Sequence, residues 1–481
     1  MLAPFSVLVA ASLCWVQASA PANRLVARVD PRVELLSLVF RLAGNSEYNQ
    51  PSSNSRYAEE VAEYFEPYKD HAVVRLARKL RQEHGVSYDA VMAMAVHLEA
   101  RSPDVAETAG RSQLLVRPKM PFAPRPERLD QRWTAADARR FVERVQQFVD
   151  EAEFSRFLAE HEKYYAAAAE RLTAQLAERD FVGWFDGFFG ARRGAKFEVY
   201  VGLLNGGGCY GVGVVYPDGR EEICPVIGAG EFDAEGLPVF REGVEGTVVH
   251  ELCHTYTNPF VDRFADELRP AAERIFKHCE AAMRDQAYGT AKTLMYESLV
   301  RASTVRYLHA RRGAAAAKKA VAGEHERGFE WVGELSELLG EYEKDRERYP
   351  SFDAFMPRVV KFFEEYAGEY EERAARAPHV VSMVPANGAD DVDAALTEIR
   401  ITFDRPMRDK SWSVVGGGPH FPETAGEISY DDERKVLTIP VRLKPNWSYE
   451  FWLNRRQFKA FRSAEGVPLE PVPVKFRTRA E

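Results

Sequence analysis

Long apolar runs and an excess of positive charge are both absent from this chain of 481 residues. After the first 20 residues, no stretch reaches the roughly 18 uninterrupted apolar residues of a membrane-spanning helix, so we expect no integral membrane segment in the mature chain. Lysine and arginine together number 64, against 73 aspartates and glutamates, and the formal net charge is −9. This acidic balance, without a basic stripe, argues against a nucleic-acid partner.

Cysteine is scarce, and the few cysteines present have no zinc-site spacing. Of the five, Cys14 lies in a segment that we expect to be removed. The others are spaced unlike a four-cysteine zinc site: Cys209, Cys224, Cys253 and Cys279. Cys209 and Cys224 fall in neighbouring predicted strands and could meet, whereas Cys253 is expected to be a buried apolar thiol. The sequence leaves open whether Cys209–Cys224 or Cys253–Cys279 form disulfides.

The first 20 residues have the pattern of a secretory signal peptide. An apolar stretch from Leu2 to Val16 is followed by Ala18-Ser19-Ala20, a small-x-small cleavage pattern, although no lysine or arginine precedes the apolar stretch. We therefore expect cleavage after Ala20. The mature protein is then secreted, periplasmic or located at the cell surface.

The periodicity of apolar residues predicts an α+β chain of two or three domains. Residues 21–190 are mostly helical in pattern, residues 196–240 alternate as a small antiparallel sheet, and residues 241–376 return to helical periodicity. Near residue 377 the pattern changes to short strands and turns, which predicts an all-β domain over residues 377–481.

Turn-forming and capping residues predict several boundaries. Asp30 is expected to cap a helix that has Pro31 in its first turn. Gly206-Gly207-Gly208 predicts a hairpin turn between strands, because no Gly-Lys-Ser/Thr phosphate signature follows it. The helix after this sheet is expected to stop at Asn258-Pro259.

The segment from Thr247 to Tyr256 contains His-Glu-x-x-His, formed by His250, Glu251 and His254. Residues four apart lie one turn above each other on an α-helix, so both histidines can offer a nitrogen to one metal ion. Glu251 lies about 100° round the helix, where its carboxylate can reach a metal-bound water without being a ligand. The alternative is a half-buried helix whose histidines only form hydrogen bonds.

A catalytic zinc ion normally has three protein ligands and one open position. The metzincin pattern fails, because Phe260 stands where its third ligand would be. Glu297 is the best candidate, since it lies on a second predicted helix downstream, as in gluzincins. An exposed helical carboxylate is the alternative for Glu297. Other residues between the two helices remain possible on chemistry alone: Asp262, Asp266, Glu267 and His278.

Arg301 follows Glu297 by one helical turn, where thermolysin-like enzymes have an aspartate that orients a histidine ligand. An arginine there could instead pair with a carboxylate or a substrate carbonyl. Attack on an amide also requires a donor for the developing oxyanion. Five nearby side chains are candidates, and the sequence does not choose among them: Tyr256, Tyr288, Tyr296, Tyr307 and Arg301.

Residues from about 25 to 375 resemble a bacterial family of uncharacterised exported proteins assigned to the zincin-like metallopeptidases. The matching stretches are VDPRVELLSLVFRLAGNSEYN, LLNGGGCYG, HELCHTYTNP and YESLVRA. The last hundred residues are similar to a bacterial immunoglobulin-like module in PANGA, ITFD and PM. The first resemblance implies a zincin-like metallopeptidase domain over residues 21–376. The second implies an immunoglobulin-like β-sandwich over residues 377–481, whose tryptophans are core aromatics or, less simply, carbohydrate contacts: Trp412, Trp447 and Trp452.

Together these patterns predict an exported zinc-dependent hydrolase, most simply a peptidase acting on a peptide or protein substrate. Zn²⁺ held by His250, His254 and Glu297 would activate a water, with Glu251 taking its proton and passing it to the leaving amine. The strand before the motif helix could offer an edge to an extended peptide. Two alternatives remain open, a catalytically silent adhesion or binding protein with this fold and a metal hydrolase of non-peptide amides or esters. The sequence gives no oligomeric state.

Overall fold

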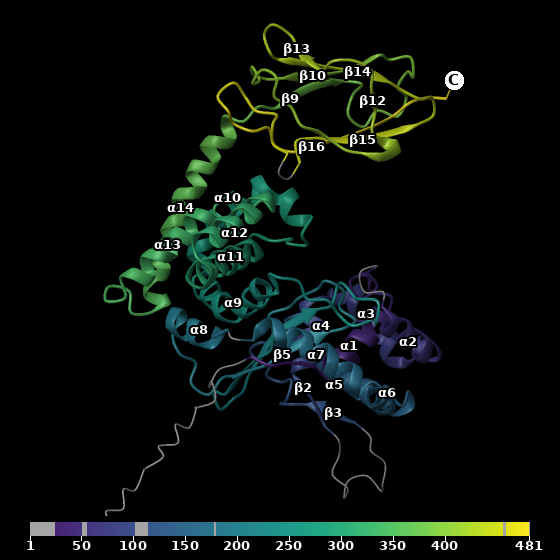
Figure 1. Ribbon diagram of the computed structural model, residues 1–481, viewed down its shortest axis with the longest axis vertical. Helices are drawn as coiled ribbons and strands as arrows, with labels where there is room; N and C mark the ends of the chain where they lie inside the picture. The colour runs from purple at the N-terminus through teal and green to yellow at the C-terminus, as the bar shows by residue number, and fades with distance from the viewer. Residues whose placement is uncertain (1–24, 51–54, 102–113, 178, 456–457, 481) are drawn as a thin grey trace, which may run out of the picture. The chain divides into compact units, whose positions relative to one another are not determined.

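The computed structural model describes residues 25–50, 55–101, 114–177, 179–455 and 458–480. The expected signal peptide, with its cleavage after Ala20, lies outside the described residues. The chain divides into two compact units, Met1–Leu252 and Cys253–Glu481, and the division falls inside one continuous helix, α9 (Val244–Arg263). Figure 1 labels many of the helices and strands, which are numbered in chain order.

Helices make up most of the first unit before residue 190, as the apolar periodicity predicts. At the first of them, the Asp30 side chain accepts a hydrogen bond from the backbone N–H of Arg32 at 3.0 Å, and Pro31 is the first helical residue. Both predicted features of this helix start are thereby confirmed. The helices are α1 (Pro31–Leu42), α2 (Arg56–Phe65), α3 (Ala72–His84), α4 (Asp89–Val96), α5 (Ala135–Glu151), α6 (Phe154–Glu160), α7 (Glu162–Leu176) and α8 (Phe181–Phe189).

The strands of the first unit do not form the small antiparallel sheet that was expected over residues 196–240. The central sheet has the order β1-β5-β8 and is parallel throughout. A second sheet has the order β4-β7-β6, and only its β6–β7 pair is antiparallel. The strands are β1 (Ala27–Val29), β2 (Leu98–Arg101), β3 (Leu115–Pro118), β4 (Lys196–Phe197), β5 (Val199–Gly202), β6 (Gly213–Val215), β7 (Glu221–Ile223) and β8 (Val226–Gly228).

The parallel pairing of β5 with β8 follows from the number of chain reversals between them. Pro217-Asp218-Gly219 turns the chain between β6 and β7, as a hairpin turn should. The glycine-rich segment after β5 reverses the chain too, but β5 and β6 belong to different sheets, so Gly206–Gly208 is not a hairpin turn. Two reversals bring β8 back in the same direction as β5, and the two strands therefore pair in parallel.

The motif helix runs through the proline that was expected to end it. Helix α9 continues past Asn258 and Pro259 to Arg263. A proline inside a helix removes one backbone hydrogen bond and costs about 3 kcal/mol. Phe260 and Val261, the next two residues, are 9% and 1% exposed, and burying their side chains offsets that cost.

The second unit starts inside α9, continues with five further helices among the described residues and ends in an all-β region. The predicted helix around Glu297 is present as α11, and its N-cap Thr290 accepts a hydrogen bond from the backbone N–H of Thr293 at 3.1 Å. The helices are α10 (Ala265–Arg284), α11 (Ala291–Arg312), α12 (Ala314–Glu326), α13 (Val332–Lys344) and α14 (Phe352–Ala375). The next regular element is a strand that starts at Val380, so helix gives way to strand close to the expected position.

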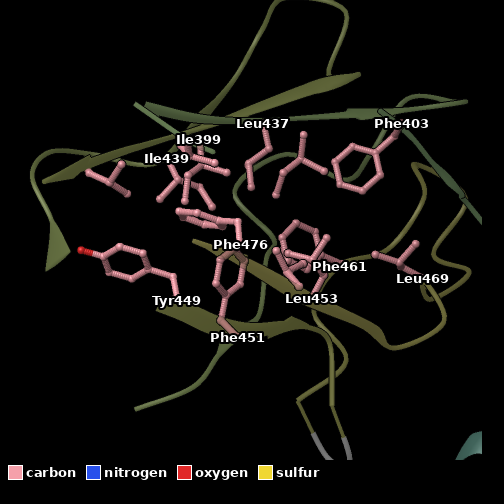
Figure 2. Packing of buried hydrophobic residues seen from close by; sticks show 14 of the residues in the cluster. Ile399, Phe403, Leu437, Ile439, Tyr449, Phe451, Leu453, Phe461, Leu469 and Phe476 are labelled. Carbon is pink, nitrogen blue, oxygen red and sulfur yellow. The ribbon is translucent and has the colours of Figure 1, made fainter. Parts of the chain in front are cut away.

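The all-β region is a sandwich of two antiparallel layers. One layer has the order β12-β14-β10-β9, with β13 also pairing β14, and the other has the order β11-β15-β16. Figure 2 shows side chains of both layers, such as Phe403 and Phe451, pointing into one core between them. The strands are β9 (Val380–Val384), β10 (Glu398–Phe403), β11 (Val414–Val415), β12 (Glu423–Thr424), β13 (Ser429–Tyr430), β14 (Val436–Arg442), β15 (Ser448–Leu453) and β16 (Val472–Arg477).

Across the described part of the chain, no helix combines the length and the apolar character that crossing a membrane requires.

Candidate metal centre

Helix α9 carries the three residues of the His-Glu-x-x-His motif. His250 and His254 are half-buried, and the carboxylate residue Glu251 is 6% exposed. The two positions inside the motif, Leu252 and Cys253, are fully buried. The apolar positions of this helix therefore pack into the protein interior, whereas the two histidines remain partly accessible.

Glu297 of α11 meets the two histidines of α9. The ligand atoms of His250, His254 and Glu297 all lie within 4.8 Å of one another. Nε2 of His254 is 3.5 Å from Oε1 of Glu297. In a tetrahedral zinc site with bonds of about 2.0–2.1 Å, neighbouring ligand atoms lie about 3.3–3.4 Å apart. The predicted ligand side chains thus converge with a spacing that fits one ion, and Glu297, which is 5% exposed, is not an exposed helical carboxylate.

Asn258 orients His254, and sequence reasoning missed this residue. Its Oδ1 lies 3.3 Å from Nδ1 of His254. Because an amide oxygen only accepts, the contact selects the imidazole tautomer protonated on Nδ1 and leaves the Nε2 lone pair directed at Glu297. Asn258 was interpreted as a helix end. Its spacing of four from His254 is the signal that could have revealed it, had the helix been extended through Pro259.

Arg301 binds carboxylates, one of the two roles predicted for it. Its Nη2 lies 2.9 Å from Oε2 of Glu297 in an ion pair that is too poorly aligned for a hydrogen bond. Its Nη1 forms a short ion pair with Glu324 of α12, and Nη2 donates a hydrogen bond to the Tyr288 hydroxyl at 2.9 Å. Burial, and then the charge of Glu297, raise the pKa of Tyr288 above its ordinary range. Glu297 is therefore enclosed by partners on the side away from His254.

The other ligand candidates, Asp262, Asp266, Glu267 and His278, are not members of this cluster, and three of them have partners of their own. Asp262 accepts a hydrogen bond from the Tyr296 hydroxyl and forms an ion pair with Lys292. Asp266 pairs with Arg269 one turn away, and the His278 ring contacts the Tyr370 ring. Among the described residues, the only group of three or more histidine, cysteine or acidic side chains close enough to hold a metal is that of His250, His254 and Glu297.

The candidate oxyanion donors are buried or already engaged. Tyr256 and Tyr307 are 1% and 0% exposed. The Tyr296 hydroxyl donates to Asp262, the Tyr288 hydroxyl accepts from Arg301, and Arg301 pairs with Glu297 and Glu324. Tyr288, Tyr296 and Arg301 would each have to exchange a partner to meet an oxyanion in this conformation.

The glycine-rich segment before α9 lies near the proposed base. Burial, and then the negative charge of Glu251, raise the pKa of the Cys209 thiol to about 12, so this thiol stays protonated at neutral pH. Cys209 and Cys224 form no disulfide with each other. The strand edge expected to receive a peptide is occupied at Val226 of β8, which exchanges two backbone hydrogen bonds of 2.9 Å with Tyr210.

The tryptophans of the sandwich have neighbours that explain them without a carbohydrate. The His420 ring stacks on Trp447, and the Lys444 ammonium lies 5.3 Å from the centre of the same ring. The Arg455 guanidinium lies 4.6 Å from the ring centre of Trp452. Trp412 lines an apolar cavity of about 500 Å³ together with residues that include Phe421 and Phe451. These rings pack within the sandwich and against its charged side chains.

Two solved structures, both of the surface layer protein SbsC, have low sequence identity to the chain. The structure of domains 1–6 is 15% identical with a TM-score of 0.17, covering 50% of this chain and 35% of that chain. The structure of rSbsC(31-844) is 12% identical with a TM-score of 0.17, covering 85% of this chain and 46% of that chain. The chain thus spans less than half the length of either structure, and scores this low establish no shared fold. No curated protein matches the chain.

Two family patterns match the sequence. The bacterial Ig-like domain matches residues 374–478, in agreement with the resemblance and with the β-sandwich there. The other pattern carries the description of a domain of unknown function, DUF4932, and it names no activity. Because this pattern matches residues 25–362, more than half of the sequence, the chain belongs to the DUF4932 family and has a bacterial Ig-like domain after that region.

Proposed function

We propose that the chain is an exported zinc-dependent hydrolase whose substrates are peptides or proteins. The observation that carries the proposal is the convergence of His250, His254 and Glu297, whose ligand atoms lie within 4.8 Å of one another. Glu251 stands on the same helix as the histidines and is not a member of that group. Two imidazoles, one carboxylate and an adjacent glutamate are what zinc hydrolases of the gluzincin type use.

The donor atoms favour zinc over the hard cations. Calcium and magnesium prefer sites made of oxygen atoms, whereas two imidazole nitrogens suit zinc and other transition metals. The contact between Asn258 and His254 supports the same choice, because a ligand histidine usually donates its second ring N–H to an oxygen acceptor. A site of three protein ligands also keeps one position open, as catalysis requires.

When bound, zinc would supply Lewis acidity, which polarises a scissile carbonyl and lowers the pKa of water. The Glu251 carboxylate would accept the proton of the attacking water and pass it to the leaving amine nitrogen. Since Glu251 is only 6% exposed, bulk water competes little for the proton that its carboxylate carries. His254, fixed by Asn258, and Glu297, fixed by Arg301, would keep their ligand atoms in place during this transfer.

The test combines metal analysis with activity on a library of peptides, for the wild type and for Glu251→Gln. We expect both proteins to bind one zinc ion, and we expect the variant to cleave peptides at least about a hundredfold more slowly than the wild type. Glu245→Gln is the matched control, because Glu245 is another buried glutamate of α9 and pairs with Arg179 at 3.6 Å. This variant should retain activity.

The same experiment separates the two alternatives from the proposal. If wild type and Glu251→Gln both bind zinc and neither cleaves any peptide, ester or amide, the chain is a binding protein and not a hydrolase. If the wild type cleaves only non-peptide esters or amides, the zinc chemistry stands and the peptide substrate is wrong.

A further inference from the structure

Arg301 approaches one oxygen of Glu297 and leaves the other to face the histidine. Its Nη2 lies 2.9 Å from Oε2, and His254 lies 3.5 Å from Oε1. Arg301 is four residues after Glu297 on α11, so the two side chains lie on the same face of that helix. Both residues are nearly inaccessible, at 6% and 5% exposed. The two oxygens of one carboxylate therefore have different neighbours.

The guanidinium is itself fixed from several directions. Glu324 of α12 pairs with its Nη1, and the Tyr288 hydroxyl accepts a hydrogen bond from its Nη2 at 2.9 Å. The ring of Phe329, fully buried, lies beneath the guanidinium with 4.3 Å between the ring centre and Cζ. A planar fork held by a carboxylate, a hydroxyl and an aromatic face has little freedom to turn. The residues that fix the Arg301 guanidinium therefore also fix the orientation of the Glu297 carboxylate with which it pairs.

Two arginines neutralise the carboxylates of this group. Arg301 lies between Glu297 and Glu324, and Arg327 also pairs with Glu324 at 3.1 Å. Buried carboxylates without such partners would repel each other. Arg301 therefore joins the two carboxylates on the side of Oε2 of Glu297, whereas Oε1 faces His254.

We infer that Arg301 is a positioning residue of the metal centre: it occupies Oε2 of Glu297 and thereby directs Oε1 to the ion. The inference rests on the proposed zinc site. In this arrangement the arginine pairs directly with the proposed carboxylate ligand. Glu324 in turn holds the arginine in place. Arg301 does not touch the substrate in this role.

The test is a double-mutant cycle on zinc affinity, measured in the full chain by competition with chelators of graded strength. Arg301→Gln should weaken zinc binding about 10- to 100-fold when Glu297 is present, the usual effect of losing a partner that orients a ligand. In the Glu297→Gln background, the same substitution should change affinity by less than about threefold, because its target has lost its charge. Equal losses in both backgrounds would show that Arg301 has only a structural role and would overturn the inference.

Arg306→Gln is the matched control. Arg306 lies on the same helix and forms a short, partly buried ion pair with Glu343, so the substitution removes the same charge without touching Glu297. Zinc affinity should stay at the wild-type value in this variant. If Arg301→Gln does not fold, Arg301→Lys replaces it. It keeps the charge but loses the planar fork, and it should bind zinc more weakly than the wild type, while wild-type affinity would overturn the inference.

The outcomes separate this inference from the proposed function. A wild-type chain that binds no zinc contradicts the metal centre as a whole. A wild-type chain that binds zinc, with Arg301→Gln binding it equally well, contradicts the role of Arg301 alone.

Discussion

Nε2 of His254 and Oε1 of Glu297 lie 3.5 Å apart, although the two residues are 43 positions apart in the chain. The Asn258 side chain lies 3.3 Å from Nδ1, on the other side of the same imidazole. A separation of 3.5 Å is close to the roughly 3.3–3.4 Å between neighbouring ligand atoms of a tetrahedral zinc ion. The two side chains are therefore proposed to form one edge of the metal site.

Removing any one of the three converging side chains should abolish tight zinc binding. We expect His250→Ala, His254→Ala and Glu297→Ala each to lower zinc affinity by at least about a hundredfold, because two protein ligands hold zinc far less tightly than three. Isothermal titration with zinc on the full chain measures this directly. His278→Ala is the control, since His278 was a ligand candidate on chemistry alone and contacts the Tyr370 ring in the structure. Loss of binding in this variant would place the ligand set elsewhere.

The sequence was sufficient to predict this cluster because its signals are local. A spacing of four puts His250 and His254 on one helical face whatever the rest of the chain does, and the third ligand needed only a second helix with a well-placed glutamate. Helix starts such as Asp30-Pro31 were predictable for the same reason, since the capping residue and the proline act within one turn.

Asn258 should contribute to zinc affinity without being a ligand. Replacing it by alanine removes the acceptor for Nδ1–H of His254, so the imidazole is free to rotate or change tautomer, and we expect zinc binding about 10-fold weaker. Asp262→Asn, one turn further along α9 and bonded to Tyr296, is the matched control and should leave affinity unchanged. Chelator competition measures both. Equal affinity in Asn258→Ala and the wild type would show that this contact does not orient the ligand.

The stability of the metal-free chain should depend on pH through Glu34 of α1. This carboxyl group accepts hydrogen bonds from the Tyr57 hydroxyl at 2.8 Å and from the backbone N–H of Leu203 at 3.0 Å, and burial raises its pKa to about 7. The folded state therefore binds the proton more tightly than the unfolded state, whose pKa is near 4.5. The contribution of Glu34 is complete below the unfolded pKa and is lost as pH rises through 7.

Glu34→Gln isolates this effect, because glutamine stays neutral, keeps one oxygen for the Leu203 N–H and can donate its amide N–H to the Tyr57 hydroxyl oxygen. Between pH 5 and pH 8 the free energy of unfolding of the wild type should fall relative to that of Glu34→Gln by on the order of 2–3 kcal/mol. Urea unfolding at a series of pH values gives the difference. A constant difference across this range would mean that Glu34 titrates at an ordinary pKa.

Asn454 should be a stability determinant of the sandwich. Its side chain is fully buried, and it donates to the backbone oxygens of Phe461 and Leu469 at 2.9 and 2.8 Å and accepts from the Phe461 N–H at 2.9 Å. Asn454→Ala leaves these backbone groups buried without partners and should cost about 3 kcal/mol. Faster hydrogen exchange in β15 and β16 of the full chain is the expected result.

Asn446→Ala is the control for this prediction. Asn446 also has a positive φ, 49° against 57° for Asn454, but it is exposed and its side chain accepts a hydrogen bond from Arg477 at the surface. Its replacement removes the same backbone preference without burying unpaired groups, so exchange in β15 and β16 should change little. If both variants exchange equally fast, the buried hydrogen bonds of Asn454 are not what stabilises this edge.

What the sequence did not predict depends on partners that are distant in the chain. The parallel pairing of β5 with β8 follows from how many times the chain reverses between them, which alternation of apolar residues does not encode. Pro259 looked like a helix end because local chemistry disfavours it, and burial of the residues after it reversed the outcome. The ion pair of Arg301 with Glu324 joins α11 and α12, and neither helix has a sequence pattern that predicts it.

His250, His254 and Glu297 are proposed to bind one zinc ion together. The most direct measurement is a crystal structure of the zinc-loaded chain with anomalous diffraction collected at the zinc absorption edge. We expect one anomalous peak within about 2.2 Å of a nitrogen of each histidine and of Oε1 of Glu297, with Glu251 outside bonding distance. A zinc-loaded crystal with no peak between these side chains, or with a peak that Glu297 does not contact, would contradict the claim.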